Sequence, residues 1–395
     1  MSPTTGRSRA LGFLRLLIAV VVFLLSLLAI IPAPTFLAWE LSVLVTEIGY
    51  VLAPIALIVL LTGDWKSAGG KVSGILAVAG TVLCISPLVR AMPVVRSLPG
   101  AFRSAFGSAS PRAMPDALPR PSPLSLRGLV FGVRSPRVRR DSMIDAMPDG
   151  RPLWIDLYRP LKSPAVPLPL VIMIHGGSWR GGTRHDLPAL NRYLASRGYA
   201  VAAVSYRFAP KYPHPAASED VHAAIQYVRT NAARLGIDSS RMALIGRSAG
   251  AQLALLAAYT ASDPAIRGVV GFYAPSDQIF GYEHPSNPRV LNSTAVLEAF
   301  LAGDPRTAGE AYRTASPINF VGARTVPTLL IHGVKDELVS VEQSERLDRR
   351  LSAAGRPHLF LRLPWATHGC DYVFNGPCGQ LSTYAIERFL SSVMR

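Results

Sequence analysis

Two glycines that flank a serine, at the junction between an apolar run and a stretch of small residues, constrain this chain most strongly. Met242 to Ile245 predicts a short buried strand, and Ala249 to Tyr259 predicts a helix that follows with almost no loop. Ser248 lies at the joint, with Gly246 and Gly250 two residues to either side. So sharp a turn needs little crowding of the backbone, and it lifts the serine hydroxyl out of the sheet. The pattern is typical of a turn that presents a nucleophilic serine.

Short apolar runs alternate with helical patterns from residue 127 onward. The runs predicted as buried strands are Leu168–Ile174, Ala200–Ser205, Met242–Ile245, Gly268–Tyr273, Thr328–Ile331 and Leu359–Leu363, and Leu153–Tyr158 alternates as an antiparallel edge strand would. The predicted helices are Leu187–Ser196, Ser218–Leu235, Ala249–Tyr259, Val341–Ala354 and Ser382–Met394. This alternation predicts an α/β fold with a mostly parallel, doubly wound sheet. In such sheets chemistry gathers at the carboxyl ends of the strands.

A glycine pair follows the first buried strand. In His175-Gly176-Gly177 the glycines allow backbone N–H groups to approach a substrate carbonyl, and the N–H of Ala249 can join them. We therefore expect Gly176, Gly177 and Ala249 to form an oxyanion hole. A tight turn without a catalytic role is the alternative.

An acid and a histidine follow the last two predicted strands. Asp336 comes after the strand that ends at Ile331, with Glu337 as the competing acid, and His368 comes after the last strand. The chain order Ser248, Asp336, His368 is that of a serine, acid and histidine triad. His332 is expected to be a packed loop residue. This chemistry needs no metal or cofactor, and the sequence contains no metal-ligand spacing.

Aromatic residues near strand ends are candidates for the substrate pocket. Trp179, Tyr206 and Tyr273 are expected to form its walls. An insertion over residues 277–319 predicts a cap above the site. Its larger side chains either line an acyl pocket or pack the cap, and packing is favoured for most of them; they are Phe280, Tyr282, Leu291 and Phe300.

The first ninety residues carry most of the apolar excess behind the 49% hydrophobic content. Leu11–Ile31, Leu41–Leu61 and Val72–Leu88 predict about three transmembrane helices within residues 1–88. A cleaved signal peptide is the alternative for the first run, and a hairpin or interfacial segment for the third. Glu47, inside the second run, is expected to face a neighbouring helix or the membrane interface.

Positive charge gathers in the same part of the chain. The net charge is +16, and residues 1–140 carry 15 Lys and Arg against four acids. This distribution favours contact with anionic lipid headgroups and argues against nucleic-acid binding. The composition of residues 89–126 predicts a basic, Pro-rich linker that lies on the membrane surface or is a solvated tether. Residues 127–395 then form the catalytic domain.

The side of the membrane follows from the number of spans. A cytoplasmic N-terminus and three spans place the catalytic domain on the outer side of the cell membrane, although the positive-inside rule is nearly balanced. Cys370 and Cys378 form a disulfide in an oxidising compartment or remain free thiols.

Taken together, these motifs resemble the α/β-hydrolase superfamily, and more narrowly the bacterial carboxylesterase/lipase group related to hormone-sensitive lipase. The resemblance covers Ile155 to Arg395 and rests on His175-Gly176-Gly177, Ser205-Tyr206-Arg207-Phe208-Ala209-Pro210, Asp220, Gly246-Arg247-Ser248-Ala249-Gly250, Asp336 and His368. It implies hydrolysis of esters with short to medium acyl chains. The sequence departs from the family pattern at Ser178, Ser205, Arg247 and Ala251.

The sequence therefore favours a membrane-anchored serine hydrolase that cleaves carboxylic esters through an acyl-enzyme. Its expected partners are a small-molecule or lipid ester and the membrane lipids. An amidase or peptidase with the same triad, and a non-catalytic interaction protein on this scaffold, are the alternatives. The natural substrate and the oligomeric state stay open.

Overall fold

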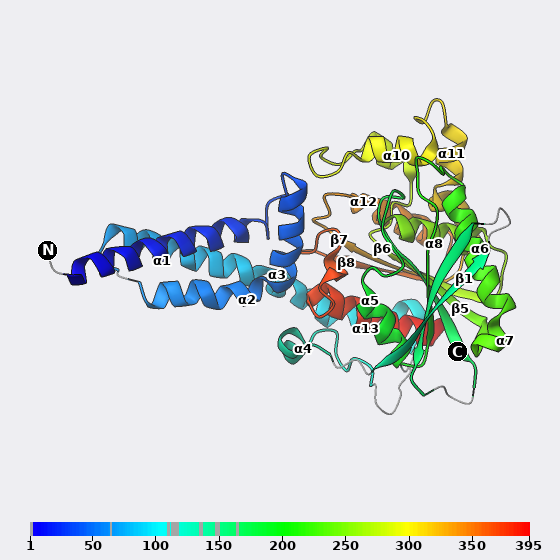
Figure 1. The fold of residues 1–395 in the computed structure, drawn as a ribbon, viewed down its shortest axis with the longest axis horizontal. Coiled ribbons are helices and arrows are strands. Elements are labelled where there is room, and N and C mark those ends of the chain that lie inside the picture. The colour runs from blue at the N-terminus through cyan, green and yellow to red at the C-terminus, as the bar shows by residue number, and fades with distance from the viewer. Residues whose placement is uncertain are drawn as a thin grey trace.

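The computed structural model describes residues 3–63, 65–108, 111, 118–133, 137–146, 151–162 and 166–395. An elongated bundle of helices projects from a larger α/β body (Figure 1). The bundle contains α1 (Pro3–Leu27), α2 (Phe36–Leu61) and the first half of α3 (Ala68–Phe106). Each of these helices is long and apolar enough to cross a membrane. Each of the three apolar runs of the sequence thus lies on one of these helices, the first of them as far as Leu27.

Helix α3 extends well beyond the predicted third run. Its 39 residues correspond to a length of about 58 Å, and its second half leaves the bundle to pack on the α/β body. Ala91, Leu98 and Phe102 are buried there in a core shared with the sheet. The prediction of a linker over residues 89–126 is therefore wrong as far as Phe106, because apolar residues at helical spacing outweigh the three prolines inside the helix.

The later part of the predicted linker is only partly described, since residues 109–110 and 112–117 lie outside the described residues. Arg120 is buried, and its backbone N–H donates to Oε2 of Glu387 at 3.0 Å. The short helix α4 (Leu126–Phe131) follows, and the Tyr50 hydroxyl on α2 donates to the Leu129 carbonyl at 2.9 Å. These residues are attached to the rest of the protein and do not form a solvated tether.

Eight strands of the described chain form one sheet in the order β1-β2-β4-β3-β5-β6-β7-β8. Strands β3 to β8 are parallel, whereas β1 and β2 are antiparallel to their neighbours. Their bounds are Val138–Ala146, Pro152–Pro160, Leu168–Ile174, Ala200–Val204, Ile237–Arg247, Ile266–Phe272, Thr328–Gly333 and His358–Leu363. The mostly parallel sheet is as predicted. The edge position expected for Leu153–Tyr158 is wrong, because β1 covers that side of β2.

Helices cover both faces of the sheet. One face packs against α6 (Ala216–Thr230), α8 (Ala249–Thr260) and α12 (Glu342–Ala353). The other face packs against the second half of α3, α5 (Pro188–Ser196) and α13 (Pro377–Val393). The short helix α7 (Ala232–Leu235) leads into β5. This is the doubly wound arrangement that the sequence predicts, with α3, a helix shared with the bundle, supplying part of one layer.

The predicted cap connects β6 to β7. It contains α9 (Gln278–Glu283), α10 (Ser293–Leu301), α11 (Gly309–Thr314) and the 3₁₀ helix η1 (Pro317–Phe320). Helices α10 and α11 lie at the top of Figure 1, beyond the edge where the site is found.

The start of α2 joins the bundle to the α/β body. Figure 1 shows that the first turns of α2 lie across the end of the bundle and that the rest of the helix runs along the bundle. Farther along, Oε1 of Glu47 accepts from Trp365 Nε1 at 3.1 Å, and Oε2 accepts from the Cys378 N–H at 2.9 Å. Glu47 therefore faces the α/β body, which differs from both of the positions expected for it. Its two hydrogen bonds hold α2 against the loop and helix that follow β8.

Candidate active site

The serine turn follows β5, in the middle of the sheet. Strand β5 ends at Arg247 and α8 begins at Ala249, so Ser248 alone makes the turn, with a φ of 51°. Both flanking glycines are sterically required. A Cβ on Gly246 would lie 2.1 Å from the Gly250 carbonyl oxygen, and one on Gly250 would lie 2.2 Å from the His175 carbonyl oxygen. The backbone strain at Ser248 is of the kind that active sites store.

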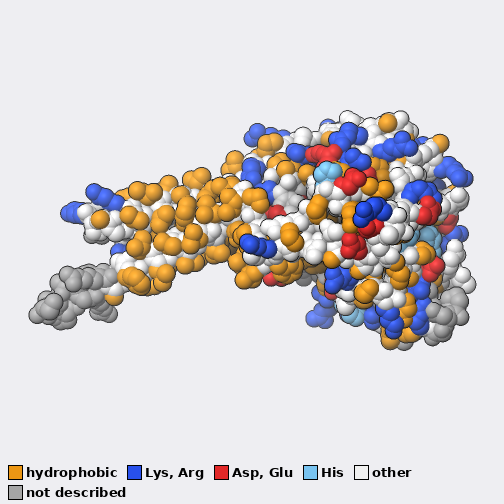
Figure 2. Space-filling view, turned by 90° about the horizontal axis from the view of Figure 1, so that it is seen from above, with side chains coloured by type: hydrophobic (Ala, Val, Ile, Leu, Met, Phe, Trp, Pro, Cys, Tyr) orange, Lys and Arg blue, Asp and Glu red, His pale blue; other side chains and the backbone are white. Residues whose placement is uncertain are grey.

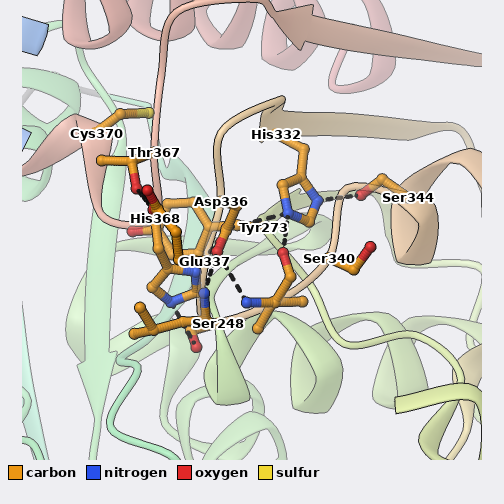
Figure 3. A network of polar contacts seen from close by, with 12 residues as sticks. Ser248, Tyr273, His332, Asp336, Glu337, Ser340, Ser344, Thr367, His368 and Cys370 are labelled. Atoms are coloured by element: carbon orange, nitrogen blue, oxygen red, sulfur yellow. Dashed lines mark hydrogen bonds and ion pairs between the residues drawn. The ribbon is translucent and has the colours of Figure 1, made fainter. Parts of the chain in front are cut away.

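Three loops bring the predicted triad residues together (Figure 3). Nε2 of His368 lies 3.0 Å from Oγ of Ser248. Its Nδ1 lies 2.7 Å from Oδ2 of Asp336. Because a carboxylate only accepts, Nδ1 carries the proton and Nε2 is free to accept from the serine hydroxyl. The imidazole and the carboxylate are both buried, so bulk water does not compete for these contacts.

Asp336 is held as a carboxylate. Its Oδ1 accepts the backbone N–H groups of Leu338 at 2.9 Å and Val339 at 2.8 Å. Burial alone would raise the pKa of Asp336, but the contacts with His368 and His332 outweigh burial and hold this pKa well below its usual range. The site therefore favours the carboxylate form of Asp336.

His332 is a second histidine on the same carboxylate. Its Nε2 lies 3.1 Å from Oδ2 of Asp336, and its Nδ1 lies 2.7 Å from Oγ of Ser344. The sequence predicts a packed residue at His332, and its side chain is indeed buried. Its contact with Asp336 was missed, although a histidine at the end of β7, four residues before the acid, was an available signal.

The competing acid has other contacts. Glu337 accepts a hydrogen bond from the Thr367 hydroxyl, and its Oε1 accepts from the Ala33 N–H at 3.1 Å. Burial raises the pKa of Glu337. Of the two acids, Asp336 contacts His368, whereas Glu337 ties its loop to the connection between α1 and α2.

The glycine turn after β3 lies against the nucleophile. A Cβ on Gly176 would be 3.4 Å from Cβ of Ser248, and Gly177 has a φ of 120°, which favours glycine. Within the described part of the chain, the N–H groups of Gly177 and Ala249 donate to no backbone or side-chain oxygen. Free N–H groups beside the serine are what an oxyanion hole requires.

A buried ion pair lies behind the serine. Arg247 pairs with Asp371, and the Tyr273 hydroxyl donates to Oδ1 of Asp371 at 2.6 Å. Burial raises the pKa of Tyr273 well above its usual value, so its hydroxyl remains a donor. The centroid of the Tyr273 ring lies 4.2 Å from that of His368. These groups position the loop that carries the histidine.

A disulfide closes that loop. Cys370 and Cys378 are bonded, with their Cα atoms 5.7 Å apart, so the structure favours the disulfide over free thiols. The bridge links the 3₁₀ helix η2 (Cys370–Tyr372) to the start of α13. Only Gly369 separates Cys370 from His368, so the bridge limits the movement of the imidazole.

Two cavities meet at Ser248 and His368. The first, of about 290 Å³, lies under the cap and is lined in part by Trp179, Phe280 and Leu291. The second, of about 380 Å³, is lined in part by Gly176, Gly177 and Tyr273. Trp179 and Tyr273 each line one of these cavities, so the pocket-wall role expected for them stays a prediction.

Tyr206 lines neither cavity. Its hydroxyl donates to the His175 carbonyl at 3.0 Å, so the pocket-wall role expected for it is wrong and it supports the glycine turn instead. Among the cap residues, Phe280 and Leu291 line the first cavity, whereas Phe300 stacks on Trp179 with the ring centroids 4.1 Å apart. Tyr282 packs against the buried core. Among the described residues, no group of three or more His, Cys, Asp or Glu is arranged to hold a metal ion.

The fold and the site together define a class. A mostly parallel sheet with a serine on a strained turn after a central strand, and an acid and a histidine on loops after two later strands, is the architecture of an α/β-hydrolase. The chain belongs to the α/β-hydrolase superfamily. Residues 155–351 match the family model described as BD-FAE.

Several of the relatives and solved structures with similar sequence or fold are esterases by name. Esterase LipC of Mycobacterium tuberculosis is 34% identical over 259 residues, covering 61% of this chain and 62% of LipC. The probable carboxylic ester hydrolase LipM of the same organism is 29% identical, covering 62% of this chain and 59% of LipM. The chain therefore spans about three fifths of the length of these curated relatives. An esterase of Pyrobaculum calidifontis superposes with a TM-score of 0.58 at 26% identity, covering 65% of this chain and 86% of the esterase.

Proposed function

We propose that this protein is a membrane-anchored serine hydrolase that cleaves carboxylic esters through an acyl-enzyme. The observation that carries the proposal is the pair of contacts made by His368, 3.0 Å to Ser248 Oγ and 2.7 Å to Asp336 Oδ2. A histidine poised between a serine on a strained turn and a buried carboxylate has the geometry of a general base.

In the proposed mechanism, Nε2 of His368 takes the proton of Ser248 as Oγ attacks the ester carbonyl. Asp336 holds the imidazole in the required tautomer and stabilises its charged form. The negative charge that develops on the carbonyl oxygen is met by the N–H groups of Gly176, Gly177 and Ala249. Each such donor contributes about 3–4 kcal/mol of transition-state stabilisation in comparable sites.

Collapse of the tetrahedral intermediate breaks the ester bond, and His368 returns the proton to the departing alcohol. Water, deprotonated by the same histidine, then attacks the acyl-enzyme, and the carboxylic acid leaves as Ser248 regains its hydrogen. The reaction consumes one water and regenerates every group of the site. No step calls on a group outside this chain, the substrate and water.

The names of the similar proteins favour esters over amides, since LipC is an esterase and LipM a probable carboxylic ester hydrolase. Rates on matched ester and amide substrates distinguish an esterase from an amidase with the same triad. An interaction protein without activity is disfavoured because Ser248, Asp336 and His368 are all in contact.

The anchor and the side of the membrane are part of the proposal. Three helices can cross a membrane, and the Pro3 end of α1 lies at the end of the bundle distant from the α/β body (Figure 1). If all three cross, the N-terminal end and the hydrolase occupy opposite sides. The disulfide between Cys370 and Cys378 favours an oxidising compartment for the hydrolase. We place the hydrolase on the outer side of the cell membrane.

One experiment tests chemistry and sidedness together. Intact cells expressing the full chain are treated with a membrane-impermeant fluorophosphonate, and the same cells are treated after lysis. We expect label at Ser248 before lysis, none in Ser248→Ala, and loss of p-nitrophenyl butyrate hydrolysis in that variant. Full hydrolysis by Ser248→Ala overturns the mechanism, whereas label that needs lysis reverses the side.

A further inference from the structure

The wall of the second cavity that faces the bundle is not part of the α/β body. Phe36 and Trp39, in the first turns of α2, line this cavity together with Ser248 and His368. The cavity under the cap, by contrast, has no lining residue from the bundle helices. The helix that continues into the membrane bundle therefore completes the space on one side of the nucleophile.

This wall is fixed to the catalytic loops and to the cap. Trp39 Nε1 donates to the carbonyl of His368 at 3.2 Å. The N–H of Phe36 donates to the Arg289 carbonyl at 3.1 Å, and the ring centroids of Phe36 and Trp39 lie 5.0 Å apart. Trp39 also packs with Val290 of the cap in one small buried cluster. The start of α2 thus spans the gap between the cap and the histidine loop.

The connection before α2 is held equally firmly. Lys335, next to Asp336, donates from Nζ to the Leu28 carbonyl at 2.8 Å, and burial lowers its pKa to about 8. On the next residue, the Glu337 carboxylate accepts from the Ala33 N–H. Hydrogen bonds from both neighbours of the triad acid therefore fix the α1–α2 connection at the site.

The outer surface of this wall is apolar and exposed. Phe36 is 48% exposed, Leu37 65% and Ile30 48%, all at the end of the bundle next to the α/β body. Figure 2 shows apolar side chains covering the bundle as far as this junction. A soluble surface rarely carries so continuous an apolar patch, and one that continues a membrane-spanning bundle faces lipid. Phe36 thus belongs both to the lining of the second cavity and to this exposed apolar surface.

We infer that the second cavity binds the apolar chain of a membrane-resident ester, which enters from the lipid layer between Phe36 and the hydrolase. The inference rests on the proposed ester hydrolysis and adds a substrate class to it: lipid esters that partition into the bilayer. An ester has a branch on each side of its carbonyl, and two cavities meeting at Ser248 give each branch a place. The branch directed toward α2 need not leave an apolar environment before the carbonyl reaches the serine.

The test compares two esters on the full chain reconstituted in phosphatidylcholine vesicles. One is p-nitrophenyl acetate, dissolved in water, and the other is p-nitrophenyl palmitate, incorporated in the vesicles. In Phe36→Ser we expect kcat/KM for the palmitate to fall at least tenfold more than kcat/KM for the acetate. Leu161→Ser is the matched control, because Leu161 is 61% exposed and lines neither cavity; its two kcat/KM values should stay at the wild-type level.

The outcomes separate the inference from the function on which it rests. Hydrolysis of neither ester by the wild type contradicts the proposed function itself. Hydrolysis of the acetate alone, or equal losses on both esters in Phe36→Ser, overturns the membrane-resident substrate while leaving the esterase intact. Labelling of Ser248 by a small fluorophosphonate confirms that the site of each variant is folded, so that a low rate is not mistaken for an unfolded protein.

Discussion

Arg247, the residue before the nucleophile, forms a buried ion pair with Asp371, three residues beyond the triad histidine. The pair joins the serine turn to the histidine loop by a route separate from the Ser248–His368 contact. Tyr273 completes it through its hydrogen bond to the same carboxylate. Arg247, one of the positions at which the sequence departs from the family pattern, thus has a structural partner of its own.

Arg247→Leu should destabilise the protein strongly, because it leaves the Asp371 carboxylate buried beside Tyr273 alone. Breaking a buried pair costs about 3–5 kcal/mol of unfolding free energy. Arg241→Leu, also on β5 but in a partly exposed pair with Asp238, should cost less than about 1 kcal/mol. Denaturant unfolding of both variants in the same detergent measures the two losses of unfolding free energy. Equal losses would show that the buried pair at Arg247 stabilises the protein no more than the partly exposed pair at Arg241.

Asp336→Asn should lower kcat about 10⁴-fold while the protein stays folded, because the amide no longer stabilises the imidazolium and favours the wrong tautomer. Glu337→Gln should lower kcat much less, by a factor at least a hundred times smaller than that for Asp336→Asn. The reason is that Glu337 contacts Thr367 and Ala33 and not His368. Steady-state hydrolysis of p-nitrophenyl butyrate decides between the two acids. A larger loss in the Glu337 variant would reverse the assignment.

Glu337→Gln should also flatten the pH dependence of stability. Burial raises the pKa of Glu337, so the folded protein binds a proton at pH values where the unfolded chain has released it. Wild-type stability therefore falls as pH rises from the unfolded pKa of about 4.3 through the raised folded pKa. Glutamine does not titrate and can still accept from the Ala33 N–H. Melting temperatures measured between about pH 4 and 8 should show a smaller fall in the variant, and parallel profiles would exclude this role.

Removal of the disulfide should loosen the histidine loop. Cys370→Ala combined with Cys378→Ala removes a cross-link over a sequence separation of 8, which is expected to lower the unfolding free energy by about 2–3 kcal/mol. Thermal unfolding with and without dithiothreitol measures the effect. Wild type should respond to the reductant and the double variant should not, while Cys84→Ala, which removes the free cysteine of the described chain, should respond as wild type does. A double variant as stable as oxidised wild type would refute the prediction.

The parts of the fold that the sequence predicts are those with local causes. Each strand from β3 onward contains a short apolar run, and Ser248, Asp336 and His368 each follow the end of one of these strands. Because the carboxyl ends of parallel strands share one edge of the sheet, strand order alone brought these side chains together. The strand β1 was missed because its charged residues, among them Arg139, Arg140 and Asp141, obscure its period. Arg140 pairs with Asp156 and Asp141 pairs with Arg159 on the neighbouring strand β2, whereas Arg139 pairs with Asp141 within β1.

The parts that were missed depend on contacts between distant segments. The second half of α3 was not predicted as a helix because it contains prolines. Its apolar face is identified as buried only when the helix packs on the sheet. Nothing within the second apolar run indicates that Trp39 reaches His368, 329 residues away, or that Glu47 reaches Cys378 across 331 residues. Local patterns predict elements and strand ends, whereas the contacts between the bundle and the hydrolase are fixed only by the complete fold.

Helix α3 belongs to the bundle at one end and to the core of the hydrolase at the other. No cut between residues 68 and 106 would therefore yield an anchor and an independent enzyme. A fragment that begins after Phe106 would lack part of the helical layer on one face of the sheet. The apolar surface exposed there would make the fragment prone to aggregation. Because this helix is continuous, in the membrane-anchored enzyme that we propose the depth and tilt of the bundle in the bilayer would also set the height of Ser248 above the lipid.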